Sequence, residues 1–414
     1  MKIKEILIIC IIIMCCIFSL QAVSAADDAN TSHDTVLTST NVSVYTLPNL
    51  DDSLQSGSVN AGTFSDLQDD IKNGGSITLN RNYTYNSSSD SSLAGGITIS
   101  KDTTIDGNGN VIIDANHLAR VFTIAKGTTV TLKGITFINA NPTSGHGGSI
   151  FAPGVVHIDN CIFINNTANY ANGGAVCLAG LGSTINNSYF EGNKAINNGK
   201  DSNGAAGAVF INANNTQISN SIFIKNMAGL NGGAIGSSAM RIENCTITNC
   251  IINNNTANGS AGGVGMQSKN FHIYNSTFKY NEAKGLFNDI TTSPYYPGNG
   301  GGMVMRGWDS YAYNCTFIGN IANQHGGGVY STNTSYNPIN NNTGFELCIF
   351  INNTAGSNGG AVDWAAGSTH GYILDSIFTN NTARRSGGAV HWSGHYGTIS
   401  NSTFTHNNAT GEVT

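Results

Sequence analysis

The sequence predicts an all-β fold, a right-handed parallel β-helix of about 10 to 12 coils with a short capping helix at its N-terminal end. Three observations support this prediction: one motif recurs to the C-terminus, a Gly-Gly pair follows most copies, and apolar stretches are only three to five residues long. Such stretches are typical of strands, and no repeat offers a helical stripe. Short strands joined by tight turns fit a coil that climbs about 4.8 Å per turn.

The motif reads Asn or Asp, Ser or Cys, any residue, Phe, two further residues, Asn, any residue and Ala, as in NCIFINNTA and NSTFKYNEA. Stacked coils place equivalent residues above one another, so we expect a Phe column in the core. We expect the Asn column at a turn with left-handed backbone angles, its amides bonding adjacent coils. The predicted Phe column contains Phe163, Phe190, Phe223, Phe278, Phe317, Phe350, Phe378 and Phe404. The predicted Asn column contains Asn166, Asn193, Asn226, Asn281, Asn320, Asn353, Asn381 and Asn407.

The same columns explain most of the cysteines. A weaker copy of the motif surrounds Asn244, with Ile247 or Ile252 in the place of Phe. The Ser/Cys position of the motif contains four cysteines, Cys161, Cys245, Cys315 and Cys348. We therefore expect them to be small inward-facing residues and not a metal cluster. Cys315 and Cys348 fall on neighbouring coils, where either two free thiols or a vertical disulfide would fit.

Residues 1–25 have the pattern of a signal peptide. Lys2 and Lys4 precede an apolar run, and small residues at its end predict cleavage between Ala25 and Ala26. The alternative is a single membrane anchor, because the run is near the shortest that spans a bilayer. With cleavage, we expect the mature protein to be secreted or held at the cell surface.

Residues 26–61 are polar and without periodicity, which predicts a flexible lead-in. The predicted β-helix occupies residues 62–414 and opens with one short amphipathic helical face, formed by Phe64, Leu67, Gln68 and Ile71. A helix in this place would cover the open apolar end of the solenoid.

The sequence stops at Thr414, in the turn after a motif, which suggests a truncated product or a fragment. A coil left uncapped there could pair edge to edge with a second copy.

Charged residues make up only 10% of the chain, and the formal net charge is −6 without a run of Lys and Arg. A nucleic-acid partner is therefore not expected. We also expect no cofactor.

Three runs carry a resemblance to a known family: FSDLQDDI, GITISKDTTIDGNGNVIIDA and ARVFTIAKGTTVTLKGITFINA. With them, the chain resembles the adhesin-like surface proteins of methanogenic archaea, which have a pectate-lyase-like β-helix. The GGAI-type and FxxN-type motifs are also similar to those of chlamydial polymorphic outer-membrane proteins. The resemblance implies an exported, non-catalytic adhesin-like protein that contacts cell surfaces or glycans. Fold alone does not fix function, so a passive component of the cell envelope is an alternative.

Enzymes that cleave pectin and other glycans also use this fold, which makes a polysaccharide lyase or hydrolase a further alternative. Gly145-His146-Gly147 matches a triplet of polygalacturonase-type hydrolases, but His146 holds the place that Asn172 and Ser386 hold before other Gly-Gly pairs. We therefore expect a turn residue. Three aspartates could suggest a calcium site, yet their spacing also fits outward positions on early strands and turns; they are Asp102, Asp106 and Asp114.

Aromatic residues are the candidates for ligand binding: Tyr295, Tyr296, Trp308, Trp364 and Trp392. The two tyrosines belong to an insertion between Ala283 and Gly301 that forms either a binding edge or a tolerated loop. Trp364 and Trp392 follow their Gly-Gly pairs at the same distance and should stack. Exposed, this stack would be a platform for sugar rings, whereas the alternation with Val362 and Val390 favours the core.

Overall fold

The computed structural model describes residues 61–197, 203–237, 242–286, 297–332, 342–366 and 368–411. The predicted signal peptide and nearly all of the predicted lead-in lie outside these residues. The chain divides into two compact units, Met1–Asn41 and Val42–Thr414, and every described residue belongs to the second. The described part of this second unit is a parallel β-solenoid of about 11 turns with one α-helix near its N-terminal end, which confirms the predicted fold class.

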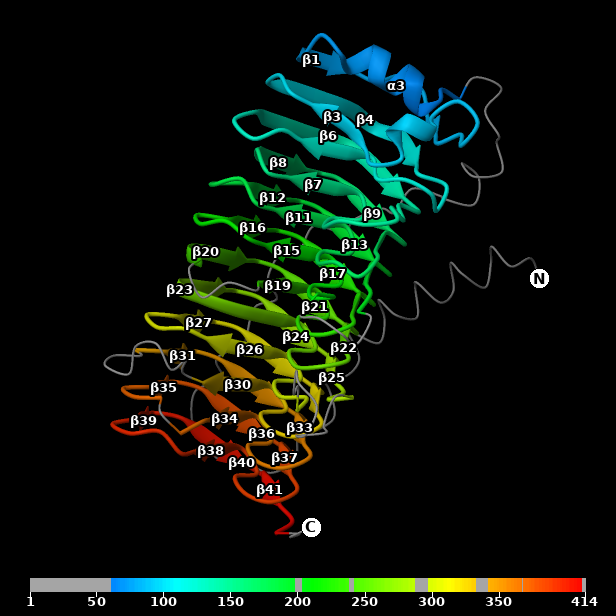
Figure 1. The fold of residues 1–414 in the computed structure, drawn as a ribbon. Coiled ribbons are helices and arrows are strands. Elements are labelled where there is room, and N and C mark those ends of the chain that lie inside the picture. Colours follow the sequence, from blue (N-terminus) through cyan, green and yellow to red (C-terminus); the bar gives the residue numbers. More distant parts are fainter. Residues whose placement is uncertain are drawn as a thin grey trace, which may run out of the picture. The chain divides into compact units, whose positions relative to one another are not determined.

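A typical coil contains four short strands that lie on three faces, here called sheets B, A and C. The strands of each face stack along the solenoid, as Figure 1 shows, and each pairs in parallel with its equivalent on the next coil. In the chain order of one coil, one strand belongs to sheet B, two belong to sheet A and one belongs to sheet C.

Sheet B is formed by β3 (Ile97–Ile99), β5 (Phe122–Ile124), β7 (Ile150–Ala152), β11 (Val176–Leu178), β15 (Val209–Ile211), β19 (Ile235–Ser237), the first part of β23 (Val264–Tyr274), β26 (Met303–Arg306), β30 (Val329–Thr332), β34 (Val362–Trp364) and β38 (Val390–Trp392). Sheet C is formed by β10 (Thr167–Ala168), β14 (Lys194–Ala195), β18 (Met227–Ala228), β22 (Thr256–Ala257), β25 (Glu282–Ala283), β29 (Ile321–Ala322), β33 (Thr354–Ala355), β37 (Thr382–Ala383) and β41 (Asn408–Ala409).

Sheet A has two rows of strands. The first row is β1 (Gly75–Thr78), β4 (Thr103–Asp114), β6 (Thr129–Ile138), β8 (Val155–Asp159), β12 (Thr184–Asn186), β16 (Gln217–Ser219), β20 (Ile242–Thr248), the end of β23, β27 (Tyr311–Tyr313), β31 (Gly344–Glu346), β35 (Tyr372–Leu374) and β39 (Thr398–Ser400). The second row is β2 (Tyr83–Thr84), the ends of β4 and β6, β9 (Ile162–Ile164), β13 (Tyr189–Glu191), β17 (Ile222–Ile224), β21 (Ile251–Asn253), β24 (Thr277–Lys279), β28 (Thr316–Ile318), β32 (Ile349–Ile351), β36 (Ile377–Thr379) and β40 (Thr403–Thr405).

A column of stacked phenylalanine rings lies inside the second row of sheet A. Neighbouring rings such as Phe163 and Phe190 are parallel within 3°, with centroids 4.7 Å apart. The register places Ile252, not Ile247, opposite Phe223 and Phe278, so Ile252 replaces Phe in the weaker copy. The stack is therefore interrupted at one coil and resumes at Phe278.

A column of buried asparagines runs beside the rings and connects the coils. The backbone N–H and Nδ2 of Asn353 both donate to Oδ1 of Asn381, at 3.0 and 2.9 Å. Nδ2 also donates to the carbonyl of Phe317 at 2.9 Å, and Oδ1 of Asn353 accepts the same pair of bonds from Asn320. The column also includes Asn255, and all its members through Asn381 are at most 1% exposed. Each side chain thus satisfies buried backbone groups of two neighbouring coils.

The left-handed backbone angles expected at these asparagines are found one residue earlier, so that expectation is wrong. Asn352, directly before Asn353, has a φ of 55°, and the same position is held by Asn165, Gly192, Lys225, Asn254, Tyr280, Gly319, Asn380 and His406. The left-handed residue turns the chain, and the next side chain then enters the interior.

The six cysteines of the described residues are buried free thiols, so the disulfide alternative for Cys315 and Cys348 is wrong. Cys250, rather than Cys245, shares the Ser/Cys column, because the register pairs the residues that follow Cys250 and Ser221. Burial raises the pKa of the Cys250 thiol to about 12, and it also raises that of Cys315. These thiols are therefore poor nucleophiles.

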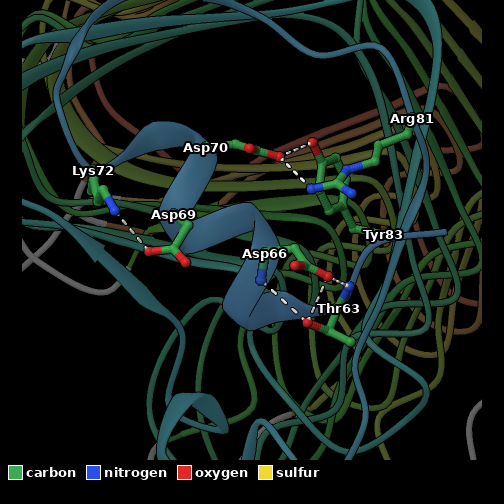
Figure 2. A network of polar contacts seen from close by, with 7 residues as sticks. All are labelled: Thr63, Asp66, Asp69, Asp70, Lys72, Arg81 and Tyr83. Atoms are coloured by element: carbon green, nitrogen blue, oxygen red, sulfur yellow. Dashed lines mark hydrogen bonds and ion pairs between the residues drawn. The ribbon is translucent and has the colours of Figure 1, made fainter. Parts of the chain in front are cut away.

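The predicted capping helix is α3 (Phe64–Ile71), at the N-terminal end of the solenoid (Figure 1). Thr63 and Asp66 form a capping box, in which Thr63 Oγ1 accepts from the Asp66 N–H and Asp66 Oδ2 accepts from the Thr63 N–H (Figure 2). Phe64, Leu67 and Ile71 are buried, but Gln68 is exposed, so the buried face is narrower than predicted.

Two aspartates fasten this helix to the first coils. Asp70 accepts hydrogen bonds from Arg81 and Tyr83 at 2.9 and 2.8 Å (Figure 2). Asp90, which precedes the 3-10 turn η1 (Ser91–Leu93), is fully buried and accepts hydrogen bonds from the N–H groups of Phe64, Ser65 and Asn86.

Among the described residues, no helix is long and apolar enough to span a membrane.

Replacing Asn353 by Leu should destabilise the solenoid by about 3 kcal/mol or more, because several buried backbone and amide groups lose their partners. The free energy of unfolding, measured by chemical denaturation, checks this. Asn352→Gly is the matched control, since Asn352 is exposed and glycine adopts its positive φ freely. Equal stability of the Leu and Gly variants would contradict the role of the column.

Asp90→Asn should destabilise the α3 cap by about 1 kcal/mol at neutral pH, because a neutral amide accepts the N–H bonds more weakly. Burial alone would raise the pKa of Asp90, but hydrogen bonds from Asn86, Ser65 and Phe64 outweigh it and lower the pKa. The stabilisation is therefore present above the unfolded-state pKa of about 3.9 and is lost as the pH falls through the folded-state pKa. Hydrogen exchange of the α3 amides should show a difference between the two proteins at neutral pH that disappears in acid; a pH-independent difference would refute this.

Candidate functional site

The structure places the five predicted ligand-binding aromatics in different environments. Tyr295 and Tyr296 lie outside the described residues. Trp308 is half-buried in the turn after β26, where its carbonyl accepts hydrogen bonds from the Asn270 N–H and the Ser310 hydroxyl. Trp364 is fully buried, so the sugar-platform interpretation of this residue is wrong.

Trp364 and Trp392 do stack, with centroids 4.4 Å apart and planes within 20°. Both side chains point to the interior from equivalent positions of β34 and β38, because they alternate with the outward residues Asp363 and His391. Trp364 also meets Phe345 edge to face at 5.3 Å, and the partly covered Trp392 packs against the same core. The pair therefore extends the hydrophobic core.

The residues considered for catalysis have structural partners. His146 is half-buried, accepts a hydrogen bond from the Asn172 N–H at Nδ1 and stacks on Phe210, and burial lowers its pKa. Asp102, Asp106 and Asp114 each accept a hydrogen bond from a nearby backbone N–H, donated by Thr129, Asn108 and Asn116 respectively. The bonds to Asp106 and Asp114 come from residues two positions later and stabilise local turns, whereas those to His146 and Asp102 join neighbouring coils.

A cluster of one aspartate and two histidines lies on the outer face of sheet B. The two carboxylate oxygens of Asp363 face Nδ1 of His325 at 3.0 Å and Nδ1 of His391 at 3.4 Å. Asp363 is only 3% exposed, because the turn that carries His325 covers it. A carboxylate that is this strongly buried is a poor candidate for direct contact with a polymer chain.

A cluster of aromatic side chains lies instead on the outer face of sheet A. Four tyrosines and one glutamate from four successive coils meet there: Tyr274 of β23, Tyr311 and Tyr313 of β27, Glu346 of β31 and Tyr372 of β35. They alternate with buried inward residues, as Tyr311 and Tyr313 do with Ala312, so their side chains point outward.

The parallel register assembles this cluster in two adjacent outer columns. One column contains Thr248, Tyr274, Tyr313 and Glu346, and the other contains His272, Tyr311, Gly344 and Tyr372. Gly344 is the only position of these two sets without a side chain. A Cβ there would lie 2.0 Å from Cζ of Tyr372, so the Tyr372 ring occupies the space above the glycine.

These side chains surround a hollow of about 490 Å³, which we call the tyrosine hollow. It is lined by Thr248, Tyr274, Asn275, Tyr311, Tyr313, Glu346 and Tyr372. A second hollow of about 480 Å³, near the N-terminal cap, is lined by Thr78, Leu79, Asn80, Arg81, Asn82, Gly107, Asn108, Asn110 and Val111 and contains no aromatic ring. The tyrosine hollow is therefore the better candidate for a ligand that stacks on rings.

Contacts among the rings hold the wall of the tyrosine hollow in place. The hydroxyls of Tyr274 and Tyr311 are hydrogen-bonded at 2.5 Å, and the two rings meet edge to face at 5.7 Å. His272 stacks on Tyr311 at 4.2 Å, and its Nε2 lies 3.2 Å from the carbonyl oxygen of Asp309. The strands beneath these side chains are paired with the neighbouring coils, which favours a preformed site.

The ionisation states of the side chains around the tyrosine hollow follow from their burial and from neighbouring groups. Burial, with the hydrogen bond to Tyr311, raises the pKa of Tyr274 to about 12. Burial and then the charge of Glu346 raise the pKa of Tyr372 to about 12. Burial also lowers the pKa of His272, although the Asp309 carbonyl opposes this shift. Tyr274, Tyr372 and His272 are therefore neutral near pH 7.

Motif counting could not find the tyrosine hollow, because coil length varies at this place. Tyr274 and Tyr313 lie on neighbouring coils but are 39 residues apart, whereas the motif copies from Phe137 to Phe190 and from Phe350 to Phe404 are only 26 to 28 residues apart. The available signal was the pattern of aromatic residues at alternate positions, His272 with Tyr274 and Tyr311 with Tyr313, which marks one outer strand face.

Comparisons with known proteins agree with the repeat architecture. Residues 314–332, 347–363 and 375–391 match the Chlamydia polymorphic membrane protein repeat. Each match begins at a left-handed turn residue of sheet A, namely Asn314, Leu347 or Asp375, and ends in a strand of sheet B. The resemblance to chlamydial repeats is thus confirmed for these segments, and the resemblance to methanogen adhesins stays a prediction.

Two solved structures are distantly similar. The catalytic unit of a thermostable GH87 alpha-1,3-glucanase from Streptomyces thermodiastaticus strain HF3-3 has 13% identity, a TM-score of 0.31, and coverage of 84% of this chain and 69% of that chain. The catalytic domain of a GH87 alpha-1,3-glucanase in complex with tetrasaccharides has 11% identity, a TM-score of 0.30, and coverage of 84% and 67%. Scores this low carry no argument about activity. No curated protein sequence matches the chain significantly.

Proposed function

We propose that this protein is an exported, surface-displayed solenoid that binds glycans without cleaving them, and that the tyrosine hollow is its binding site. The observation that carries the proposal is the set of four tyrosines that three coils present around one hollow on the outer face of sheet A. A pyranose ring has an apolar C–H face and a rim of hydroxyls. Tyrosine rings offer a matching apolar surface, and their hydroxyls offer hydrogen bonds to the rim.

The polar groups of the hollow support binding rather than hydrolysis. Of the described residues that line it, Glu346 is the only carboxylate. Glycoside hydrolases generally use two carboxyl groups on opposite sides of the scissile bond. Asn275 and Thr248 add neutral donors and acceptors, which suit the hydroxyls of a sugar.

Surface display is supported by two independent features of the chain. The matching repeat takes its name from a polymorphic membrane protein family, and the N-terminal residues have the pattern of an export signal. A rigid solenoid that carries its binding side chains on strands is well suited to contact between surfaces.

Tyr313→Ala should weaken the binding of any glycan identified on an array by about tenfold, which corresponds to about 1.4 kcal/mol for the loss of one stacking ring. Tyr313 is a half-buried outward residue, so the fold should persist. Calorimetric titration checks the affinity. Tyr170→Ala is the matched control, because Tyr170 is 55% exposed on a turn outside the hollow. Equal affinities of the two variants would rule out the tyrosine hollow as the site.

Gly344→Ala tests the shape of the site without removing a ring. The new Cβ would lie where the Tyr372 ring now lies, so this ring must move into the hollow or away from it. We expect affinity to fall severalfold while the thermal unfolding temperature changes little, since alanine is compatible with a strand. Unchanged affinity would show that Tyr372 does not contact the glycan.

A further inference from the structure

We infer that the tyrosine hollow selects a positively charged ligand, a glycan whose sugar units carry free, protonated amino groups. This inference rests on the proposed glycan-binding function and adds the charge of the ligand to it. Three features of the hollow carry it: the position of Glu346, the faces of the tyrosines and the absence of basic lining residues.

Glu346 places an uncompensated negative charge at the hollow. Its strand position lies directly opposite Tyr313, and its side chain is half-buried. Within the part of the chain that the structure describes, this carboxylate has no ion-pair or side-chain hydrogen-bond partner. By contrast, Glu191 and Glu282 on other coils pair with Lys225 and Lys284, at 3.0 and 3.9 Å. A carboxylate left unpaired beside a hollow favours a cationic occupant.

The tyrosines add to this preference, because the face of an aromatic ring carries negative partial charge and attracts cations. The ring of Tyr372 is near enough to Glu346 for the carboxylate to raise its pKa, and Tyr274 and Tyr372 both stay protonated and neutral. A cation at this place would therefore meet several ring faces and one carboxylate together, an arrangement typical of sites that bind ammonium groups.

No basic residue offsets these groups. The residues that line the hollow include no Lys or Arg among those described, and the adjacent His272 has a pKa lowered by burial. An acidic glycan would bring its carboxylates against Glu346 without a cationic partner. A neutral glycan would leave the Glu346 charge unpaired on binding, so the amine-bearing glycan should bind best.

The test compares two oligosaccharides that share one backbone, the β-1,4-linked glucosamine hexamer and its N-acetylated counterpart. Titrations are carried out at low salt and about pH 6, where most sugar amines are protonated and a glutamate is ionised. We expect the glucosamine hexamer to bind about tenfold more tightly, as one cation–π contact and one charge-assisted hydrogen bond would allow. This difference should shrink at high salt.

Glu346→Gln keeps the shape of the side chain and removes its charge. We expect it to abolish most of the preference for the glucosamine hexamer and to leave the affinity for the acetylated hexamer within about twofold. Glu282→Gln is the matched control, since it makes the same change in net charge on sheet C and should preserve the preference.

The outcomes separate this inference from the function on which it rests. Equal binding of both hexamers to the unmodified protein, or loss of the preference in Glu282→Gln as well, would overturn the inference and leave a glycan-binding site. Failure of both hexamers and of every neutral glycan on an array to bind would overturn the proposed function itself.

Discussion

The vertical register between coils is the constraint on which the rest of the structure depends, and the buried asparagine column enforces it. Each member bonds the backbone of the coil before it and the amide of the coil after it, so a coil that shifted by one residue would leave several buried polar groups unpaired. Apolar packing alone would not give this precision, because Phe and Ile are both accepted in the neighbouring column, as Ile252 shows. Directional hydrogen bonds fix the register, and the stacked rings supply the buried area.

The same register builds the candidate site from residues that are far apart in the sequence. Tyr274, Tyr313 and Glu346 become vertical neighbours only because each coil lies in place on the last. A shift of one residue would turn Tyr311 and Tyr313 toward the core and Ala312 toward solvent. Core residues and candidate binding residues therefore alternate along the same strands. Packing of the inward side chains fixes the register, and the register decides which side chains point outward.

Much of the fold could be predicted from the sequence, because stacked coils require the same residue types at the same positions. The Phe and Asn columns follow directly from that requirement, whereas the helix at Phe64–Ile71 was predicted from its apolar spacing and from the need to cover the open end of the solenoid. The left-handed residue was expected one position too late, since the motif shows which residue recurs but not which φ it adopts. The candidate site was missed for a different reason: the outer positions of the first strand row of sheet A carry no repeated residue type, and the long coil before Tyr313 breaks the spacing. For Trp364 the alternation with Val362 already favoured the core over a sugar platform, and the residue is fully buried. Edge-to-edge self-association through the last coil stays a prediction.

Hydrogen–deuterium exchange of the protein with and without the glucosamine hexamer tests the central claim most directly, because it asks whether one ligand contacts several coils at once. The account predicts increased protection at four separate segments, residues 272–274, 311–313, 344–346 and 372–374, with little change in the same coils on sheet C. Protection limited to one continuous stretch of sequence, or located on sheet B, would contradict the assembly of the site by coil register.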